Sequence, residues 1–423
     1  MATDLLELAD RLWRGDADIT EHHPFRMFGE IAEVGPAAAF VAAFSNVAAF
    51  TTDDGMVLVD TSSPFLTGRV HDELRGWRAD TLHTAVFTHG HIDHVFGVER
   101  YEADAREHGA VEPRVVAHEA VPARFDRYIA TAGYNAVINR RQFGLEGFVW
   151  PTDYRYPDDT YRESMTLDVG GTRFELHHAR GETDDHTWVW LPDARILCTG
   201  DLFIWASPNC GNPQKVQRYP KDWAVALRTM ADLGAETLLP GHGLPIRGAD
   251  RVRESLQNTA ALLEGLHDDT LRMMNEGARL DEILHTVHAP QSLLEKPYLR
   301  PIYDEPEFVV RNVWRLYGGW HDGNPAHLKP APESALAAEV ATLAGGAARL
   351  AARARALAEA GELRLAGHLA EWAAAADPGD PDAQRARAEV FEARQAAEAS
   401  TMSKGIFGAA AREARDELGE GTA

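Results

Sequence analysis

Short apolar runs alternate with polar breaks between about residues 36 and 60. The runs AFVAAF, NVAAF and MVLVD are rich in β-branched and aromatic residues, which favours strands. The break Asp53-Asp54-Gly55 predicts a hairpin, because Asp-Gly supplies the positive-φ positions of a tight turn. A helix-like stretch and a strand at 83–87 follow, and this alternation continues to about residue 245. Strands interleaved with helices predict a layered α/β or α+β domain.

From about residue 250 the apolar residues take helical spacing, and no further strand pattern follows. The stretch GWHDGNPAHLKPAPE is dense in Gly and Pro, which is typical of a linker. We therefore expect a lead-in (1–25), a layered domain (26–250), a helical extension with the linker (251–325) and an all-α domain (326–423). The all-α domain is rich in alanine, which allows close helix–helix contact, and we expect it to serve assembly.

Two apolar stripes are predicted along the helices of this last domain. The first contains Leu336, Val340 and Leu343, and the second contains Leu365, Leu369, Trp372 and Ala376. The break DPGDPDA then precedes another helix.

The composition narrows the range of partners and locations. The chain has 423 residues, with 42 Lys and Arg against 65 Asp and Glu, a net charge of −23. Such an acidic surface argues against nucleic acid or an anionic membrane as the main partner. Two cysteines, Cys198 and Cys210, cannot form a disulfide framework or a Cys-only zinc site. The sequence shows neither a membrane span nor a signal pattern, so we expect a cytoplasmic protein.

The motif THGHIDH carries the clearest chemistry. It places His89, His91, Asp93 and His94 within six residues, directly after the predicted strand LHTAVF. This spacing can supply two adjacent metal ions from one loop, and imidazole with carboxylate suits zinc, iron or manganese without any thiolate. The alternative is a His-rich loop with ordinary polar contacts. Four metal-capable side chains within six residues make that alternative the weaker one.

HxHxDH after a strand resembles the metallo-β-lactamase superfamily, and three further motifs follow that family's order. LVDTSSP ends its strand with Asp60, CTGD contains Asp201, and PGHG contains His242. The resemblance implies an αββα sandwich with a metal site on one edge. It also implies that Asp60 supports the metal loop, that Asp201 bridges two metals, and that His242 is the last histidine ligand.

One departure from the common pattern points to a branch of that superfamily. The sequence has Arg180-Gly181-Glu182-Thr183 where most members have a histidine in a Gly-His-Thr setting. An acidic ligand there resembles the alkyl sulfatases, although that branch often has glutamate where this chain has Asp201. Residues 275–283, 319–330 and the C-terminal helices also resemble alkyl sulfatases, including their dimerisation domain. No counterpart of their sterol-carrier-like third domain is present in the sequence, which weighs against a preference for long detergent chains.

The resemblance implies two Zn²⁺ per chain, with other divalent metals as alternatives. Its first site would use His89, His91 and Glu182, its second Asp93, His94 and His242, with Asp201 between them. Two such ions can hold a bridging hydroxide. We therefore expect Asp93 and Asp201 to be catalytic. We consider His186 either a catalytic proton donor that lines the site, or a supporting or surface histidine.

Cationic and amide side chains are needed to hold an anionic substrate. NRRQFG resembles an Arg-Arg segment of the alkyl sulfatases, which makes Arg140 and Arg141 candidates. Lys215 and Arg218 follow Asp201 in the sequence, and Asn209 could donate hydrogen bonds to sulfate oxygens. The alternatives are solvated surface cations and, for Asn209, simple turn formation.

The sequence thus predicts a dinuclear zinc hydrolase that cleaves alkyl sulfate esters, small anionic molecules, to inorganic sulfate and an alcohol. It also predicts a homodimer formed through residues 326–423. One alternative is another hydrolase of the same superfamily, acting on a lactone, thioester or β-lactam. The other is a non-catalytic, metal-binding, dimeric interaction protein.

Overall fold

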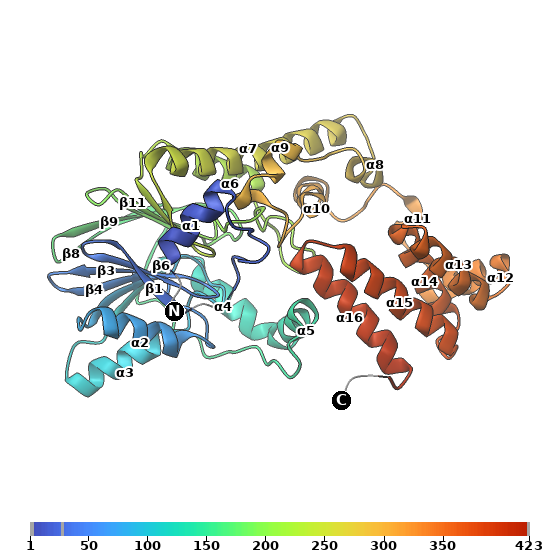
Figure 1. Ribbon diagram of the computed structural model, residues 1–423, viewed down its shortest axis with the longest axis horizontal. Helices are drawn as coiled ribbons and strands as arrows, with labels where there is room; N and C mark the ends of the chain where they lie inside the picture. The colour runs from blue at the N-terminus through green and yellow to red at the C-terminus, as the bar shows by residue number, and fades with distance from the viewer. Residues whose placement is uncertain (1–3, 27–28, 421–423) are drawn as a thin grey trace. The chain divides into compact units, whose positions relative to one another are not determined.

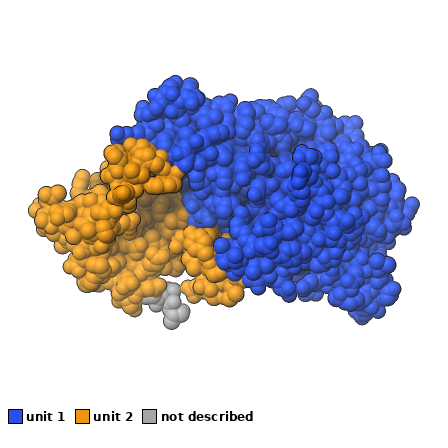
Figure 2. All heavy atoms as spheres, turned by 180° about the vertical axis from the view of Figure 1, so that it is seen from behind, with its two compact units in different colours: residues 1–132, 151–319 blue, residues 133–150, 320–423 orange. Residues whose placement is uncertain are grey.

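The computed structural model describes residues 4–26 and 29–420. The chain forms two compact units, shown in different colours in Figure 2. The first unit contains residues 1–132 and 151–319, and the second contains residues 133–150 and 320–423. Residues 133–150 lie inside the range that the sequence indicated for the layered domain, yet they group with the C-terminal helices.

The first unit is built on two mixed sheets. The larger sheet has seven strands in the order β1-β2-β3-β4-β5-β6-β7, antiparallel up to β4 and parallel from β4 to β7. Its strands are β1 (Glu30–Gly35), β2 (Ala38–Ala42), β3 (Val47–Thr52), β4 (Gly55–Val59), β5 (Leu82–Val86), β6 (Arg114–His118) and β7 (Asp159–Tyr161). The hairpin predicted at Asp53-Asp54-Gly55 joins β3 to β4.

The second sheet has six strands in the order β13-β12-β11-β10-β9-β8. Its one parallel pair is β11 with β12, and the other neighbours are antiparallel. The strands are β8 (Ser164–Val169), β9 (Thr172–His178), β10 (Thr187–Leu191), β11 (Ile196–Gly200), β12 (Thr237–Pro240) and β13 (Ile246–Arg247). Phe50 on β3 meets Phe174 on β9, with ring centroids 5.6 Å apart, so the two sheets share one core.

Helices cover the sheets on both sides (Figure 1). α2 (Thr67–Trp77) and α3 (Val98–His108) pack on the larger sheet, whereas α7 (Ala249–Asn275) packs on β12 and β13 and also contacts α6 (Pro220–Ala231). The other helices of this unit are α1 (Leu5–Arg14), α4 (Val121–Ala130), α8 (Leu280–Leu284), α9 (Gln291–Leu294), η1 (Pro297–Leu299) and α10 (Pro306–Gly318). The predicted αββα sandwich followed by a helical region is confirmed.

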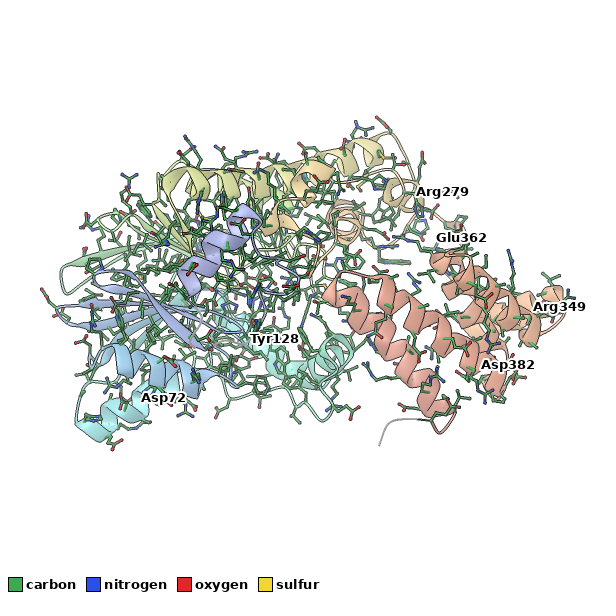
Figure 3. The ribbon with its side chains drawn as sticks, viewed as in Figure 1. Asp72, Tyr128, Arg279, Arg349, Glu362 and Asp382 are labelled. Carbon is green, nitrogen blue, oxygen red and sulfur yellow. The ribbon has the colours of Figure 1, made fainter. Side chains whose placement is uncertain are left out.

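The second unit is entirely helical over its described residues. It contains most of α5 (Ala132–Phe143), followed by α11 (Pro325–Leu328), α12 (Glu333–Ala344), α13 (Ala347–Glu359), α14 (Leu363–Ala376), α15 (Pro381–Ala397) and α16 (Thr401–Glu417). Asp382, labelled in Figure 3, lies at the start of α15. It forms an ion pair with Arg355 on α13 at 3.0 Å. α5 joins this unit at α16, where Gly405 lies so close to the Gln142 carbonyl that a side chain would not fit.

Small residues, rather than the predicted leucines, form the contacts between α12 and its neighbours. Ala337 and Ala341 are buried, whereas Leu336 is half exposed and Leu343 is 87% exposed. The predicted stripe on α12 is therefore wrong at Leu336 and Leu343, which point away from the alanine contacts, whereas its third member, Val340, packs against the core of this unit. Among the described residues, no single helix is long and apolar enough to cross a membrane. Only α12 and α13 together reach that length and composition, across a bend of 85°.

Candidate metal centre

Five segments of the first unit meet at one edge of the sandwich. Four of them follow the carboxyl ends of β4, β5, β11 and β12, and the fifth is the turn between β9 and β10. Because β4 and β5 are parallel, as are β11 and β12, the loops after each pair leave at the same end. Asn46 connects the two sheets there, since its side-chain amide donates to the carbonyls of Pro240 and Gly243.

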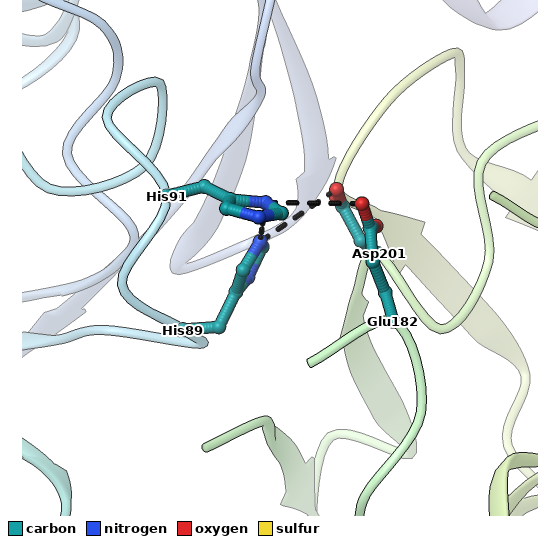
Figure 4. Close-up of side chains that lie close together, drawn as sticks. All are labelled: His89, His91, Glu182 and Asp201. Carbon is teal, nitrogen blue, oxygen red and sulfur yellow. Dashed lines mark hydrogen bonds and ion pairs between the residues drawn. The ribbon is translucent and has the colours of Figure 1, made fainter. Parts of the chain in front are cut away.

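Four side chains form the first cluster of possible ligands. His89, His91, Glu182 and Asp201 each offer one donor atom, all within 4.8 Å of one another. Figure 4 shows the two imidazoles, from the loop after β5, facing the two carboxylates from the other sheet. The Nδ1 atom of His91 lies 3.8 Å from Glu182 Oε1, and His89 Nε2 lies 3.7 Å from Asp201 Oδ2.

The second cluster lies beside the first. Donor atoms of Asp93, His94 and His242 also lie within 4.8 Å of one another, and Asp93 Oδ2 is 3.6 and 3.5 Å from the two Nε2 atoms. Asp201 reaches this cluster too, with Oδ1 3.4 Å from His94 Nε2 and Oδ2 3.4 Å from His242 Nε2. One carboxylate therefore faces both clusters, which is the geometry of a bridging ligand.

The donor chemistry of these clusters suits divalent cations. Asp93, Glu182 and Asp201 bring three carboxylates into one buried region, where their mutual repulsion favours a bound cation. His94 Nε2, Glu182 Oε2 and Asp201 Oδ1 are buried without a hydrogen-bond partner among the described residues. Burial also lowers the pKa of His89 well below its usual value, which keeps its ring neutral and able to ligate.

Hydrogen bonds behind the clusters fix the orientation of the rings. Asp60, at φ 62°, accepts hydrogen bonds from the backbone N–H and the hydroxyl of Thr88 at 2.7 and 2.8 Å, and contacts His94 Nδ1 at 2.7 Å. The Nδ1 atom of His242 forms a hydrogen bond with the backbone carbonyl of Phe44. Both rings therefore present Nε2 to the centre, as metal-binding histidines generally require.

His186 lies behind Asp201. It is fully buried, and its Nε2 accepts a hydrogen bond from the backbone N–H of Asp201 at 3.1 Å. Burial lowers the pKa of His186 to about 4, so the ring is neutral near pH 7. This contact gives His186 a part in holding Asp201 in place. A role as proton donor stays a prediction.

Three of the predicted substrate-binding residues lie close to the clusters. Asn209 and Arg218 are buried, and both contact Glu182: the amide donates to Oε1, and the guanidinium lies 2.9 Å from the same atom. Lys215 is half buried, and burial together with Arg218 lowers its pKa to about 8.

The other two predicted substrate-binding residues belong to the second unit. Arg140 and Arg141 are in the last turn of α5 and line a hollow bordered by α15 and α16. The guanidinium of Arg140 donates to the carbonyl of Phe148 at 2.9 and 2.7 Å. Their part in substrate binding stays a prediction.

Sequence reasoning missed a buried ion pair next to the first cluster. Arg124 on α4 is 3% exposed, and its Nε donates to Asp185 Oδ2 at 2.7 Å. The same oxygen accepts a hydrogen bond from the backbone N–H of Gly90, between His89 and His91, at 3.0 Å. The pair therefore links the loop that carries His89 and His91 to the turn that carries Glu182. The only signal in the sequence is the position of Asp185, three residues after Glu182.

We expect Gly241→Ala to empty the centre of metal. A methyl group at Gly241 would overlap Asp201 Oδ1 and the backbone between Gly200 and Asp201, so the bridging carboxylate would have to move. The metal content of the dialysed variant, measured by mass spectrometry, should fall well below that of the native chain. Gly265→Ala on α7 is the matched control, because a methyl group there meets open space. Native metal content in Gly241→Ala would contradict the bridging role of Asp201.

Comparison with known proteins places these features among characterised families. Residues 41–242 match the family described as the metallo-β-lactamase superfamily, and residues 279–417 match the one described as alkyl sulfatase dimerisation. A linear primary-alkylsulfatase from Pseudomonas is 27% identical over 347 residues, which cover 76% of this chain and 63% of that protein. The alkyl/aryl-sulfatase BDS1 of Saccharomyces cerevisiae is 26% identical over 82% of this chain and 58% of its own length.

A solved structure supports the same architecture. The stereoselective inverting sec-alkylsulfatase Pisa1 from Pseudomonas matches 93% of this chain and 66% of its own, with a TM-score of 0.81 at 24% identity. At this identity the likeness establishes the fold. The chain spans about three-fifths of the length of the curated relatives it matches.

Proposed function

The chain belongs to the metallo-β-lactamase superfamily, in the branch with an alkyl sulfatase dimerisation region, and we propose that it hydrolyses alkyl sulfate esters to inorganic sulfate and an alcohol. The observation that carries the proposal is the position of Asp201, 3.4 to 3.7 Å from ring nitrogens of both ligand clusters. This arrangement supports a dinuclear centre, with zinc as the metal that its nitrogen and oxygen donors suit.

Each residue of the centre has a distinct part in this proposal. Two divalent ions, when bound, would supply an activated water and would polarise the ester. His89, His91 and Glu182 would hold the first ion, and Asp93, His94 and His242 the second. Asp201 would hold the two ions at a fixed separation. His186 would keep Asp201 in place by accepting a hydrogen bond from the backbone N–H of Asp201.

The cations near Glu182 fit an anionic substrate despite the acidic surface of the protein. A fixed charge inside a partly buried site acts more strongly than distant charges in water. Lys215 interacts electrostatically with both Asp93 and Glu182. In this proposal its ammonium group binds and orients the sulfate group of the substrate. Arg218 and Asn209 contact Glu182 directly and would keep that carboxylate in place beside the sulfate.

Sulfate release is the direct test. Zinc-loaded protein would be offered short and long, primary and secondary alkyl sulfates, and free sulfate would be measured by ion chromatography. Release that Asp93→Ala abolishes supports the proposal, and the best substrate indicates the size of the pocket. If two metals are bound and no sulfate appears, lactones, thioesters and β-lactams are tested next, and alkyl sulfate hydrolysis is rejected. Inactivity towards all of them favours a non-catalytic metal-binding protein.

We expect substrate affinity to weaken as the pH rises through about 8. Lys215 has a pKa lowered to about 8, so its positive charge is present below that pH and lost above it. KM for an alkyl sulfate should therefore increase between pH 7 and pH 9, with a smaller change in kcat. In Lys215→Arg the charge persists, because arginine stays protonated throughout this range. An unchanged pH profile of KM in Lys215→Arg would remove Lys215 from the proposed sulfate site.

A homodimer formed by the second unit is part of the same proposal. Residues 279–417 match the alkyl sulfatase dimerisation family, and large apolar side chains are exposed on the helices of this unit. Among them are Leu328 on α11, Leu336 and Leu343 on α12, and Leu365 on α14. Where such side chains form one continuous patch, a partner typically covers it. A cytoplasmic location stays a prediction.

We expect removal of residues after 325 to yield a monomer. The truncated chain would lose the exposed leucines together with the helices that carry them. Sedimentation velocity of the full chain should give twice the chain mass, whereas the truncated chain should sediment at its own mass. A truncated chain that still sediments as a dimer would place the interface in the first unit.

A further inference from the structure

The segment 207–218 brings two side chains to Glu182 without any helix or strand of its own. It lies between β11 and α6 and contains turns and extended backbone. Asn209 donates its side-chain amide to Glu182 Oε1, and Arg218 contacts both the carboxylate and the backbone carbonyl of Glu182. An irregular segment cannot hold buried side chains in place by itself, so its position must be fixed by neighbouring structure.

The first neighbour is α10. The side-chain amide of Asn312 makes a two-point contact with the backbone of Arg218: its Oδ1 accepts from the N–H at 3.2 Å, and its Nδ2 donates to the carbonyl at 3.0 Å. Asn312 is buried, and Gln217 also donates to its Oδ1, at 2.8 Å. One side chain of α10 thus fixes the backbone from which the Arg218 guanidinium extends.

The second neighbour is the loop before α10. The fully buried carboxylate of Asp304 accepts a hydrogen bond from the backbone N–H of Gly211, and the carbonyl of Arg300 accepts from the N–H of Ser207 at 3.0 Å. Gly211 also lies against the backbone of Phe308, so closely that a side chain would not fit. These contacts lie on both sides of Asn209 and fix the position of its amide.

We propose that Asn312 and Asp304 are positioning residues for Glu182, acting through Arg218 and Asn209 respectively. The proposal rests on the metal centre proposed above and concerns its first site. Both residues lie within the range that matches the alkyl sulfatase dimerisation family, 279–417. Part of that region therefore has a second task in its own chain, which is to hold a ligand of the metal centre.

The expected signature is loss of affinity at one metal site and retention at the other. Removing a residue that orients a metal ligand typically weakens binding by about 10–100-fold. We therefore expect Asn312→Ala to weaken the Glu182 site by that factor, while the Asp93, His94 and His242 site keeps its affinity. A general loosening of the fold would weaken both sites together.

The experiment is a zinc titration of the full-length apoprotein in competition with a chromogenic chelator. Glu182→Gln identifies the binding phase that belongs to the first site. Asn312→Ala and Asp304→Ala should weaken that same phase. Asp304→Asn should restore it in part, because the amide oxygen can still accept from the N–H of Gly211, although the contact of the second oxygen with the N–H of Glu305 is lost. Arg311→Ala, an exposed neighbour on α10, is the matched control and should bind as the native chain does.

The outcomes separate this inference from the proposed function. If the native chain binds no zinc, both are rejected. If it binds two zinc ions and Asn312→Ala binds them equally well, or loses both phases in parallel, the positioning role is rejected and the metal centre stands. Should Asn312→Ala fail to fold, the comparison of Asp304→Ala with Asp304→Asn decides alone, and equal affinities in that pair reject the role of Asp304.

Discussion

Asp201→Asn is expected to reduce the hydrolysis of alkyl sulfates by more than about 100-fold, because loss of a direct ligand exceeds the effect of losing a supporting residue. Its two oxygens lie 3.4 to 3.7 Å from His89, His94 and His242, and an asparagine amide nitrogen cannot replace the second oxygen as a ligand. Zinc content and kcat/KM should fall together. The charge is also lost where two other carboxylates compete for the cations.

An exposed aspartate provides the control for this substitution. Asp168→Asn on β8 removes the same charge from a surface pair with Arg173, and we expect native activity and zinc content. If Asp201→Asn retained two zinc ions and full turnover, the carboxylate would not bridge the two clusters. The proposed dinuclear mechanism would then be rejected even if sulfate release itself were observed.

Arg124→Ala is expected to lower the free energy of unfolding by about 3–5 kcal/mol, because it leaves one partner of a buried ion pair without compensation. Arg124 and Asp185 are both buried, so the carboxylate would lose its charged partner in the interior of the fold. Gly90 would keep its bond to a carboxylate that is no longer anchored, so the metal loop should also loosen. Urea denaturation of the apoprotein measures the first effect, and zinc affinity measures the second.

The pH dependence of this effect has a definite sign. Burial acts to raise the pKa of Asp185, but Arg124 and the hydrogen bonds hold it below its usual value. The pair therefore stabilises the native chain above about pH 4, where an unfolded aspartate is ionised, and this contribution is lost at lower pH. In Arg124→Ala the buried carboxyl takes up a proton more readily, so the difference from the native chain should shrink as the pH falls.

A surface pair again provides the control. Arg173→Ala breaks the exposed contact with Asp168 at 3.0 Å, and exposed pairs contribute about 0–1 kcal/mol. If Arg124→Ala cost no more than Arg173→Ala, the buried pair would not stabilise the fold. The double variant Arg124→Ala/Asp185→Asn removes the unpaired charge and should recover part of the loss.

The sequence predicted the candidate ligands because most of them stand in short motifs. His89, His91, Asp93 and His94 share one loop. Asp201 directly follows β11, and His242 follows β12 after one glycine, both strands being rich in apolar residues. A strand end followed by a polar ligand is a local pattern. The structure brings these ligands together at one edge, as the parallel pairs β4–β5 and β11–β12 require.

The supporting residues could not be predicted in this way. Arg124, Asn312 and Asp304 occur in ordinary helical or loop sequence, and their partners lie from 61 to 94 residues away along the chain. Some of their contacts are to backbone atoms. Every residue type has these atoms, so such a contact does not depend on which residue the partner is. The grouping of residues 133–150 with the C-terminal helices was missed for a similar reason, since it depends on how α5 meets α16.

The order of the ligands along the chain has a consequence for biosynthesis. The ribosome delivers the loop with His89 to His94 first, while Glu182, Asp201 and His242 come from the second sheet, which is synthesised later. Asn312 and Asp304, which hold the neighbourhood of Glu182, emerge later still. A nascent chain therefore cannot present the complete set of candidate ligands until both sheets, up to the loop after β12, have been synthesised. A chain that ended before β12 would lack His242 and could not form the complete centre.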